Sequence, residues 1–281
     1  MRSTTVLTLV AMFAFAANSL LCRMALGEGL IDAASFTTAR VISGAFTLSL
    51  ILLPRWRTRS RSPVNWRSAI MLFTYMAFFS FAYLSLSAGT GALLLFGAVQ
   101  LTMFAVAFRS GEHFPGLSWI GLALAVFGLV CLVSPGLTAP DPLGAVLMAI
   151  AGVAWGVYSL LGKNVADPLE ATASNFILSV PLVVLVSLVF QGDFQITLKG
   201  LVLAFASGSV ASGLGYVIWY AALKGLTTTR AATVQLSVPI IAAIGGVILL
   251  SEQVTFRLLL ASVATLGGIA LVLMQRTATD N

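Results

Sequence analysis

Residues 4–22 read TTVLTLVAMFAFAANSLLC, a stretch in which no side chain is charged. A helix needs about 20 largely apolar residues to cross the hydrocarbon core of a bilayer, so this stretch is long enough. Its backbone must satisfy its own hydrogen bonds, because lipid offers no partners, and it is therefore predicted to be helical. The preceding Arg2 and the small residues Ala14 and Ala16 are also typical of a signal peptide. We expect a retained first span instead, because a counterpart of this segment occurs later in the chain.

Nine further apolar stretches follow the first one. Strands of a membrane barrel would alternate in polarity and run for about ten residues, and these stretches do neither. Short breaks with turn-forming residues separate them, for example residues 88–91 (AGTG) and 134–136 (SPG). The sequence predicts an all-α membrane protein with ten transmembrane helices, at residues 4–22, 33–53, 68–88, 91–108, 116–134, 143–162, 171–190, 200–223, 231–250 and 257–274.

The composition is that of a protein whose surface mainly faces lipid. Hydrophobic residues make up 59% of the 281 residues and charged residues only 9%, whereas a soluble domain carries about 25% charged residues. The mean hydropathy is +1.03. A net charge of +6 could indicate nucleic acid, but in a membrane protein such an excess is typical of the cytoplasmic face. We expect membrane lipids as partners and no nucleic acid.

The sequence offers no metal site or disulfide framework. Cys22 and Cys131 both lie inside apolar runs, and His113, the single histidine, has no Cys or His neighbour. We therefore expect the cysteines to behave as small buried hydrophobic residues, and we predict no metal and no cofactor.

The distribution of basic residues predicts the orientation in the membrane. With both termini in the cytoplasm, 11 of the 15 basic residues fall in cytoplasmic segments, as the positive-inside rule requires. The strongest determinant is the cluster from Arg55 to Arg67, which is flanked by Trp56 and Trp66. The cytoplasmic set is Arg2, Arg55, Arg57, Arg59, Arg61, Arg67, Arg109, Lys163, Lys224, Arg230 and Arg276.

The chain contains an internal repeat. A shift of 140 residues places residues 19–23 (SLLCR) over residues 159–163 (SLLGK), and it places Phe15 over Trp155. Several further matches share this offset, which predicts two homologous halves of five helices each, residues 1–139 and 140–281.

An odd number of spans in each half determines the relation between the halves. The second copy must enter the membrane from the opposite side, so the halves are expected to be inverted repeats. Inverted repeats are the architecture of many alternating-access transporters, in which the substrate binds near the middle of the membrane between the two halves. The pattern therefore favours transport over a purely structural role, with the substrate site near the middle of the membrane between the halves.

Particular residues carry a resemblance to a known family. Each half has a glutamate in the loop before its last helix, Glu112 and Glu252, and the last helix of the second half contains residues 267–268 (GG). With Pro239 in the ninth span, this pattern resembles the drug/metabolite transporter superfamily, and most closely its EamA-type members. The overall pattern, including Asn18 and Ser19 in the first span, most resembles that of the bacterial aromatic amino-acid exporters of that superfamily. The resemblance implies a central cavity lined by helices one, three, four, six, eight and nine.

Polar and aromatic residues within the spans are the candidates for substrate binding. Polar groups inside a membrane usually face the protein interior or a cavity. Amides and hydroxyls can bind the charged ends of an amino acid, and aromatic rings can contact its apolar or cationic part. The alternative is that these aromatic residues pack against other helices or face lipid. The candidates are Asn18, Tyr75, Phe79, Phe96, Gln100, Trp155, Tyr158, Ser159, Tyr216, Trp219 and Gln235.

Arg40 lies one or two turns inside the second span, and three roles remain open for it. Its side chain could extend to the membrane surface, as long basic side chains do. It could also pair with Glu28 or Asp32 near the outer face, or bind a carboxylate of the substrate.

The missing motifs exclude several mechanisms. No phosphate-binding loop is present, which excludes ATP coupling within this chain, and no catalytic cluster suggests an enzyme. All nine acidic residues lie in loops, at span ends or in the tail. A proton-coupled exporter of organic cations usually needs a buried carboxylate, so this distribution favours a zwitterionic substrate.

We therefore expect an exporter of amino acids, aromatic and other neutral ones, in the bacterial inner membrane. It would work by alternating access, as a monomer with both termini in the cytoplasm. Two alternatives remain. One is an exporter of drugs or other small metabolites, and the other is a membrane protein that binds lipids or takes part in signalling without transporting anything.

Overall fold

The protein is a bundle of long helices, and its computed structural model describes residues 2–55, 65–111, 114–136, 138–162, 165–226 and 233–279. The first half contains α1 (Arg2–Gly27), α2 (Ala33–Leu52), α3 (Trp66–Ala82), α4 (Ala88–Arg109) and α5 (Gly116–Val133). The second half contains α6 (Pro142–Gly162), α7 (Pro168–Val189), α8 (Leu198–Phe205), α9 (Gly215–Leu223), α11 (Ser237–Leu250) and α12 (Phe256–Thr279). A π-helical segment, η3 (Ala206–Leu214), joins α8 to α9.

The described helices confirm the all-α membrane fold. Nine of them, counting Leu198–Leu223 and Thr233–Leu250 as one helix each, are apolar and at least 18 residues long, which suffices to cross a membrane. The remaining helix, α3, has 17 residues and is the third of the ten predicted spans. Each helix overlaps its predicted span, with ends that differ by up to six residues.

The predicted break at residues 88–91 is wrong. These four residues form the first turn of α4, and the turn lies earlier, after α3 ends at Ala82. Ser87 caps the new helix, because its hydroxyl accepts a hydrogen bond from the backbone N–H of Thr90 at 3.3 Å. The glycines of this stretch serve close packing instead of a turn. A Cβ atom on Gly89 would lie 2.8 Å from a side chain of α11.

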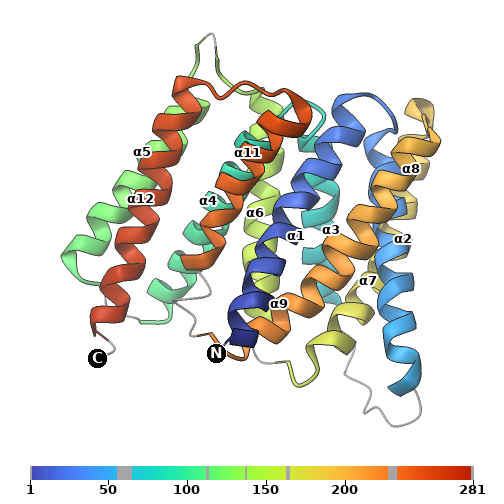
Figure 1. Cartoon of the computed structure of the whole chain (residues 1–281), viewed down its shortest axis with the longest axis horizontal. Helices are drawn as coiled ribbons and strands as arrows, with labels where there is room; N and C mark the ends of the chain where they lie inside the picture. The colour runs from blue at the N-terminus through green and yellow to red at the C-terminus, as the bar shows by residue number, and fades with distance from the viewer. Residues whose placement is uncertain are drawn as a thin grey trace.

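The helices form a flattened bundle with both chain ends at the same edge (Figure 1). The pair α5 and α12 forms one side of the bundle, and α2, α7 and α8 form the opposite side (Figure 1). Between them, α6 packs against α3 and α4, while α1 packs against α9 and α11. Along the helix axes, we call the end of the bundle that carries the N- and C-termini the termini end, and the opposite one the far end.

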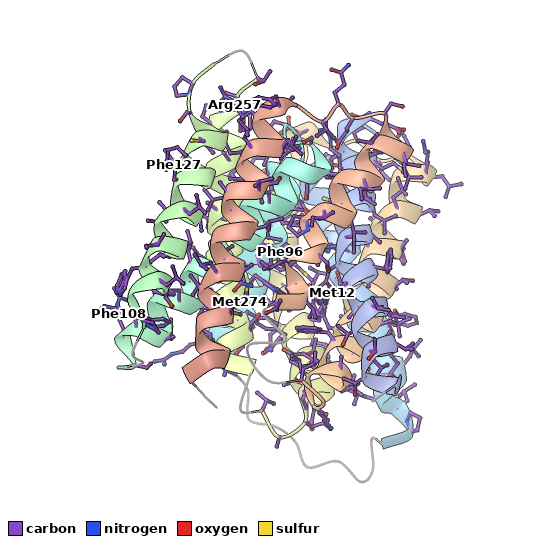
Figure 2. The ribbon with its side chains drawn as sticks, turned by 60° about the vertical axis from the view of Figure 1, so that its left-hand side comes forward. Met12, Phe96, Phe108, Phe127, Arg257 and Met274 are labelled. Carbon is purple, nitrogen blue, oxygen red and sulfur yellow. The ribbon has the colours of Figure 1, made fainter. Side chains whose placement is uncertain are left out.

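The outward surface is apolar, as a lipid-facing surface should be. Phe108 and Phe127 lie on the outside of the bundle and are 52% and 62% exposed, whereas Met12 and Phe96 lie in its interior (Figure 2). The interior contains aromatic rings and several polar side chains, all of them buried. The candidate site is therefore sought in the interior.

Candidate functional site

A small pocket at the centre of the bundle is the candidate site. Its walls come from α1, α3, α4, α6 and α9, so five helices from both halves of the chain meet there. Its cavity volume is about 10 Å³, roughly the space that one water molecule needs. The side chains that line the pocket therefore fill almost all of its space. It is lined by Phe15, Asn18, Ser19, Tyr75, Phe79, Leu95, Phe96, Trp155 and Tyr216.

Trp155 is the centre of an aromatic cluster in this pocket. The centroid of its ring lies 4.7 Å from that of Tyr75, 5.0 Å from Tyr216 and 6.1 Å from Phe15. Tyr158, one turn along, packs against the same ring at 5.6 Å. These separations are those of tilted and edge-to-face aromatic pairs. The cluster presents ring faces and edges to whatever enters the pocket.

A polar network lies beside the rings and centres on the hydroxyl of Tyr75. This oxygen accepts hydrogen bonds from Asn18 Nδ2 and from Arg40 Nη2, each at 3.3 Å. The Asn18 carbonyl oxygen accepts from the Ser207 hydroxyl at 2.6 Å. Arg40 also donates to the Ser212 hydroxyl, from Nε at 3.3 Å and from Nη2 at 3.2 Å. The network links α1, α2, α3 and η3 behind the pocket.

The π-helical geometry of η3 allows both of its serines to take part. The N–H of Gly215 bonds to the carbonyl of Val210, five residues earlier, which is the bond that defines a π-helix. In an α-helix, residues five apart point about 140° away from each other. Within η3, Ser207 and Ser212 instead reach the same network. Such π segments occur frequently at functional sites.

A second cavity, of about 400 Å³, lies between the central pocket and the termini end. Its walls include Gly162 at the end of α6, Pro168 at the start of α7 and Lys224 after α9. Gly225 packs against Thr4 at the start of α1, which places this cavity near the chain ends. We call it the vestibule. Trp219 lines the vestibule, and its ring lies 5.7 Å from that of Phe15 in the pocket, so the two cavities are neighbours.

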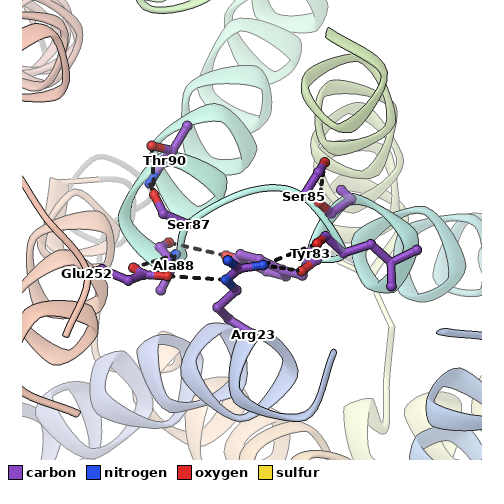
Figure 3. A network of polar contacts seen from close by, with 9 residues as sticks. Arg23, Tyr83, Ser85, Ser87, Ala88, Thr90 and Glu252 are labelled. Atoms are coloured by element: carbon purple, nitrogen blue, oxygen red, sulfur yellow. Dashed lines mark hydrogen bonds and ion pairs between the residues drawn. The ribbon is translucent and has the colours of Figure 1, made fainter. Parts of the chain in front are cut away.

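The far end is closed by a network around Arg23 and Glu252 (Figure 3). Arg23 Nε forms an ion pair with Glu252 at 3.3 Å, and its Nη1 donates to the carbonyls of Tyr83 and Leu84. The Glu252 carboxylate also accepts from the N–H of Ala88 at 2.9 and 3.0 Å. A carboxylate is favourable at this place, since it faces the N-terminus of α4. The network ties α1, the α3–α4 turn, α4 and the loop after α11 together.

The sequence-predicted residues fall into three groups. One group lines the pocket and a second group of three lines the vestibule. The third group, Gln100 and Tyr158, is buried and lines neither cavity. Glu112 and His113 lie outside the described residues. The vestibule group is Ser159, Trp219 and Gln235. The pocket group is Asn18, Tyr75, Phe79, Phe96, Trp155 and Tyr216.

The pocket also contains residues that we did not predict. Phe15 lines it, and the shift of 140 residues that places Phe15 over Trp155 was a usable signal. The same shift places Ser19 over the candidate Ser159, so it was a usable signal there too. Leu95 has no such signal, because a leucine is an ordinary residue in a membrane helix. Ser207 contacts the pocket residue Asn18 only because η3 departs from α-helical geometry.

Two of the three roles considered for Arg40 are wrong. Its side chain is fully buried, so it does not extend to the membrane surface. Glu28 pairs with Lys199 at 2.8 Å instead, and Asp32 caps α2 by accepting from the N–H of Ser35. Arg40 lies over the rings of Tyr75 and Phe79, with its guanidinium carbon 5.4 and 4.9 Å from their centroids.

Long apolar helices with an apolar outward surface define a class, that of multi-pass membrane proteins. The EamA-like transporter family matches residues 142–274 of this chain. An uncharacterized protein of Pseudomonas aeruginosa is 49% identical over 275 residues, which cover 98% of this chain and 96% of that protein. The chain belongs to the EamA-like transporter family, within the drug/metabolite transporter superfamily.

More distant relatives agree with this family. A protein of Escherichia coli named "Probable amino-acid metabolite efflux pump" is 27% identical over 235 residues, which cover 75% of this chain and 77% of its own. Its namesake in Salmonella typhimurium is 29% identical over 219 residues, covering 69% and 72%. A solved crystal structure with 20% identity superposes with a TM-score of 0.71 over 98% of this chain and 99% of that one, which shows the shared fold.

The polar network predicts unequal effects for two similar substitutions in the pocket. Tyr75→Phe removes the acceptor of both Asn18 and Arg40, and it should lower the free energy of unfolding by about 1–3 kcal/mol. Tyr216→Phe removes a buried hydroxyl that forms no hydrogen bond of normal length, so its cost should be well below that of Tyr75→Phe. Thermal unfolding of the purified protein in detergent without substrate measures both. Equal losses for the two variants would contradict the proposed network.

Proposed function

We propose that the protein exports amino acids, aromatic and other neutral ones, across the bacterial inner membrane by alternating access. The observation that carries this proposal is the closed central pocket, in which aromatic rings surround a small set of amide and hydroxyl groups. Rings suit an apolar or aromatic side chain, and the polar groups suit the charged ends of an amino acid. The names of the Escherichia coli and Salmonella relatives support the substrate class.

The proposal includes an architecture of two inverted repeats, residues 1–139 and 140–281. The packing of the helices supports it, because most major contacts in one half have a counterpart in the other. The packing of α3 against α6 corresponds to that of α9 against α1, and the packing of α4 against α6 corresponds to that of α11 against α1. The pairs α2 with α7 and α5 with α12 each join equivalent helices.

Individual residues support the same two-fold axis. Residues at equivalent positions of two repeats contact each other only where they lie near the axis that relates the repeats. Phe15 and Trp155 are 140 positions apart and their rings are in contact. Ala125 and Thr265 have the same separation, and the Thr265 hydroxyl donates to the Ala125 carbonyl at 3.4 Å. The axis would thus pass close to the central pocket, where the halves meet.

The distribution of charge supports an orientation with both termini in the cytoplasm. The vestibule would then open the protein toward the cytoplasm, while the network around Arg23 and Glu252 closes the periplasmic side. In this conformation a cytoplasmic substrate can approach the pocket, which agrees with export. Because one chain supplies every wall of the pocket, we propose that the monomer is the functional unit.

Counterflow tests the proposed activity. Purified protein is reconstituted into liposomes that contain unlabelled phenylalanine, and labelled phenylalanine is added outside without any ion gradient. We expect uptake well above that of empty liposomes, reduced by other neutral amino acids. Asn18→Ala and Trp155→Ala should lower the uptake at least about tenfold, since each removes a group from the pocket wall.

A matched substitution on the lipid-facing surface controls this experiment. Phe127 is 62% exposed on the outside of α5, so Phe127→Ala should retain wild-type uptake. Failure of folded wild-type protein to take up phenylalanine, threonine or methionine would contradict amino-acid transport. Organic cations and other metabolites would then be the next substrates to test.

Alternating access requires that the network at the far end opens. Cys22 is fully buried one turn from Asn18, on the side toward Arg23, so its thiol can report opening. In a Cys131→Ala background, Arg23→Gln should increase the reaction of Cys22 with a membrane-impermeant maleimide added to intact cells. The expected increase is about fivefold, since a half-buried ion pair contributes about 1 kcal/mol.

A second cation at the far end provides the control for charge. Lys199 pairs with Glu28 at 2.8 Å, but both side chains are largely exposed. Lys199→Gln should therefore leave the labelling rate of Cys22 unchanged. If Arg23→Gln labels as slowly as the wild type, the network does not hold the far end closed. Labelling only in inverted membranes would reverse the proposed orientation.

A further inference from the structure

Arg40 is a buried cation that no carboxylate in the described part of the chain neutralises. Its side chain is 0% exposed, seven residues after the start of α2. Its hydrogen bonds go to two neutral hydroxyls, those of Tyr75 and Ser212. The ion pairs found at the far end, Arg23 with Glu252 and Lys199 with Glu28, do not include it. A cation in this environment is normally paired, because hydrocarbon and apolar side chains solvate charge poorly.

Hydrogen-bond donors without partners gather around the same place. In the described residues, four buried side-chain atoms form no hydrogen bond, and three of them belong to Arg40, Ser19 and Tyr216. Ser19 and Tyr216 line the central pocket. The Arg40 atom is Nη1, which can only donate. Arg40 does not line the pocket but is bonded to Tyr75, which does. Buried polar atoms in proteins are rarely left unpaired, so three of them at the pocket and directly behind it call for a functional explanation.

Each of the three unpaired atoms can donate, and Arg40 Nη1 can do nothing else. The Tyr75 oxygen accepts from both Asn18 and Arg40, so its own hydrogen is still available to an acceptor. The Asn18 carbonyl, a possible acceptor, already accepts one hydrogen bond, from the Ser207 hydroxyl. A carboxylate is the complementary group, since it only accepts hydrogen bonds and carries the opposite charge to Arg40.

We propose that Arg40, with the hydroxyls of Tyr75 and Tyr216, forms the site for a carboxylate of the substrate. The hydroxyl of Tyr75 belongs to the pocket wall and is bonded to Arg40 Nη2. A carboxylate that accepts from this hydroxyl therefore lies next to the guanidinium. The site selects molecules with an acidic end and disfavours organic cations that lack one. This inference rests on the proposed transport of small molecules and adds the group by which they are recognised.

Binding of matched acids and amides tests the carboxylate site without relying on transport. Thermal stabilisation of the purified full chain is measured against phenylalanine and phenylalaninamide, and against phenylacetate and phenylacetamide. We expect each acid to reach half of its stabilising effect at about tenfold lower concentration than its amide, or lower still. Equal midpoints for acid and amide in both pairs would overturn the proposal, with no variant needed.

Variants of Arg40 assign the preference to this side chain. Arg40→Gln removes the charge, so the acid and amide midpoints should become about equal. Arg40→Lys keeps the charge but loses the bidentate hydrogen-bonding geometry of the guanidinium, and should retain part of the preference for acids. Arg257 provides the matched control, because it binds backbone carbonyls at the end of α5 and lies away from the pocket. Arg257→Gln should keep the wild-type ratio.

The outcomes separate the two proposals. Folded Arg40→Gln protein with the wild-type ratio would overturn the role of Arg40. If Arg40→Gln does not fold, the Arg40→Lys variant and the wild-type ligand pairs decide. Transport of phenylalanine without any preference for acids would support amino-acid export and contradict the carboxylate site. A preference for acids without counterflow of amino acids would support the site and contradict that substrate class.

Discussion

Polar groups within the membrane must find their partners inside the bundle, because hydrocarbon offers none, and most of this structure follows from that constraint. Hydroxyls in the spans bond to the preceding turn of their own helix, as Thr37 does with the carbonyl of Ala33 at 2.7 Å. The acidic side chains described in the structure stay near the two ends, where Asp32 and Glu252 receive backbone N–H groups. Arg40 departs from this pattern. An arginine costs about 3 kcal/mol at the centre of a membrane helix on an insertion scale, and Arg40 lies about two turns inside α2. Its retention without a carboxylate partner therefore requires a compensating role.

The hydrogen bonds that Arg40 and its neighbours form depend on a local change in helix geometry. Close contact between α2 and η3 brings Ser212 to Arg40, and a Cβ atom on Gly208 would collide with the backbone carbonyl of Arg40. The π-helical bonds of η3 place Ser207 at Asn18 while Ser212 remains at Arg40. The segment η3 therefore supplies a hydroxyl to each of the two residues, Asn18 and Arg40, that donate to Tyr75. Because α9 continues directly from η3, the segment also sets the position of Tyr216 in the pocket wall.

The positions of the spans could be predicted because hydrophobicity is a property of whole stretches, and single residues do not alter it. The error at residues 88–91 arose because glycine is common both in turns and at close helix contacts, and Gly89 serves the second purpose. In the pocket, Asn18 and Trp155 were predictable as polar or aromatic residues inside spans. The contact of Ser207 with Asn18 was not, since it depends on a π-helical segment that an average period of 3.6 residues hides. The absence of a carboxylate partner for Arg40 also required the structure, because Glu28 and Asp32 are near in sequence but are engaged elsewhere.

The central claim is that substrate occupies the pocket around Trp155, between the two halves of the chain. Photo-crosslinking with labelled p-azidophenylalanine, followed by mapping of the modified peptides, tests it most directly. The account predicts labelling of α1 near Asn18, of α6 near Trp155 and of α9 near Tyr216, and competition by unlabelled phenylalanine should abolish it. An apolar groove of about 320 Å³ between α11 and α12, lined by Ile248 and Leu259, is a place outside the pocket where an aromatic molecule could also bind. Labelling that is confined to this groove, or that phenylalanine does not compete away, would contradict the account.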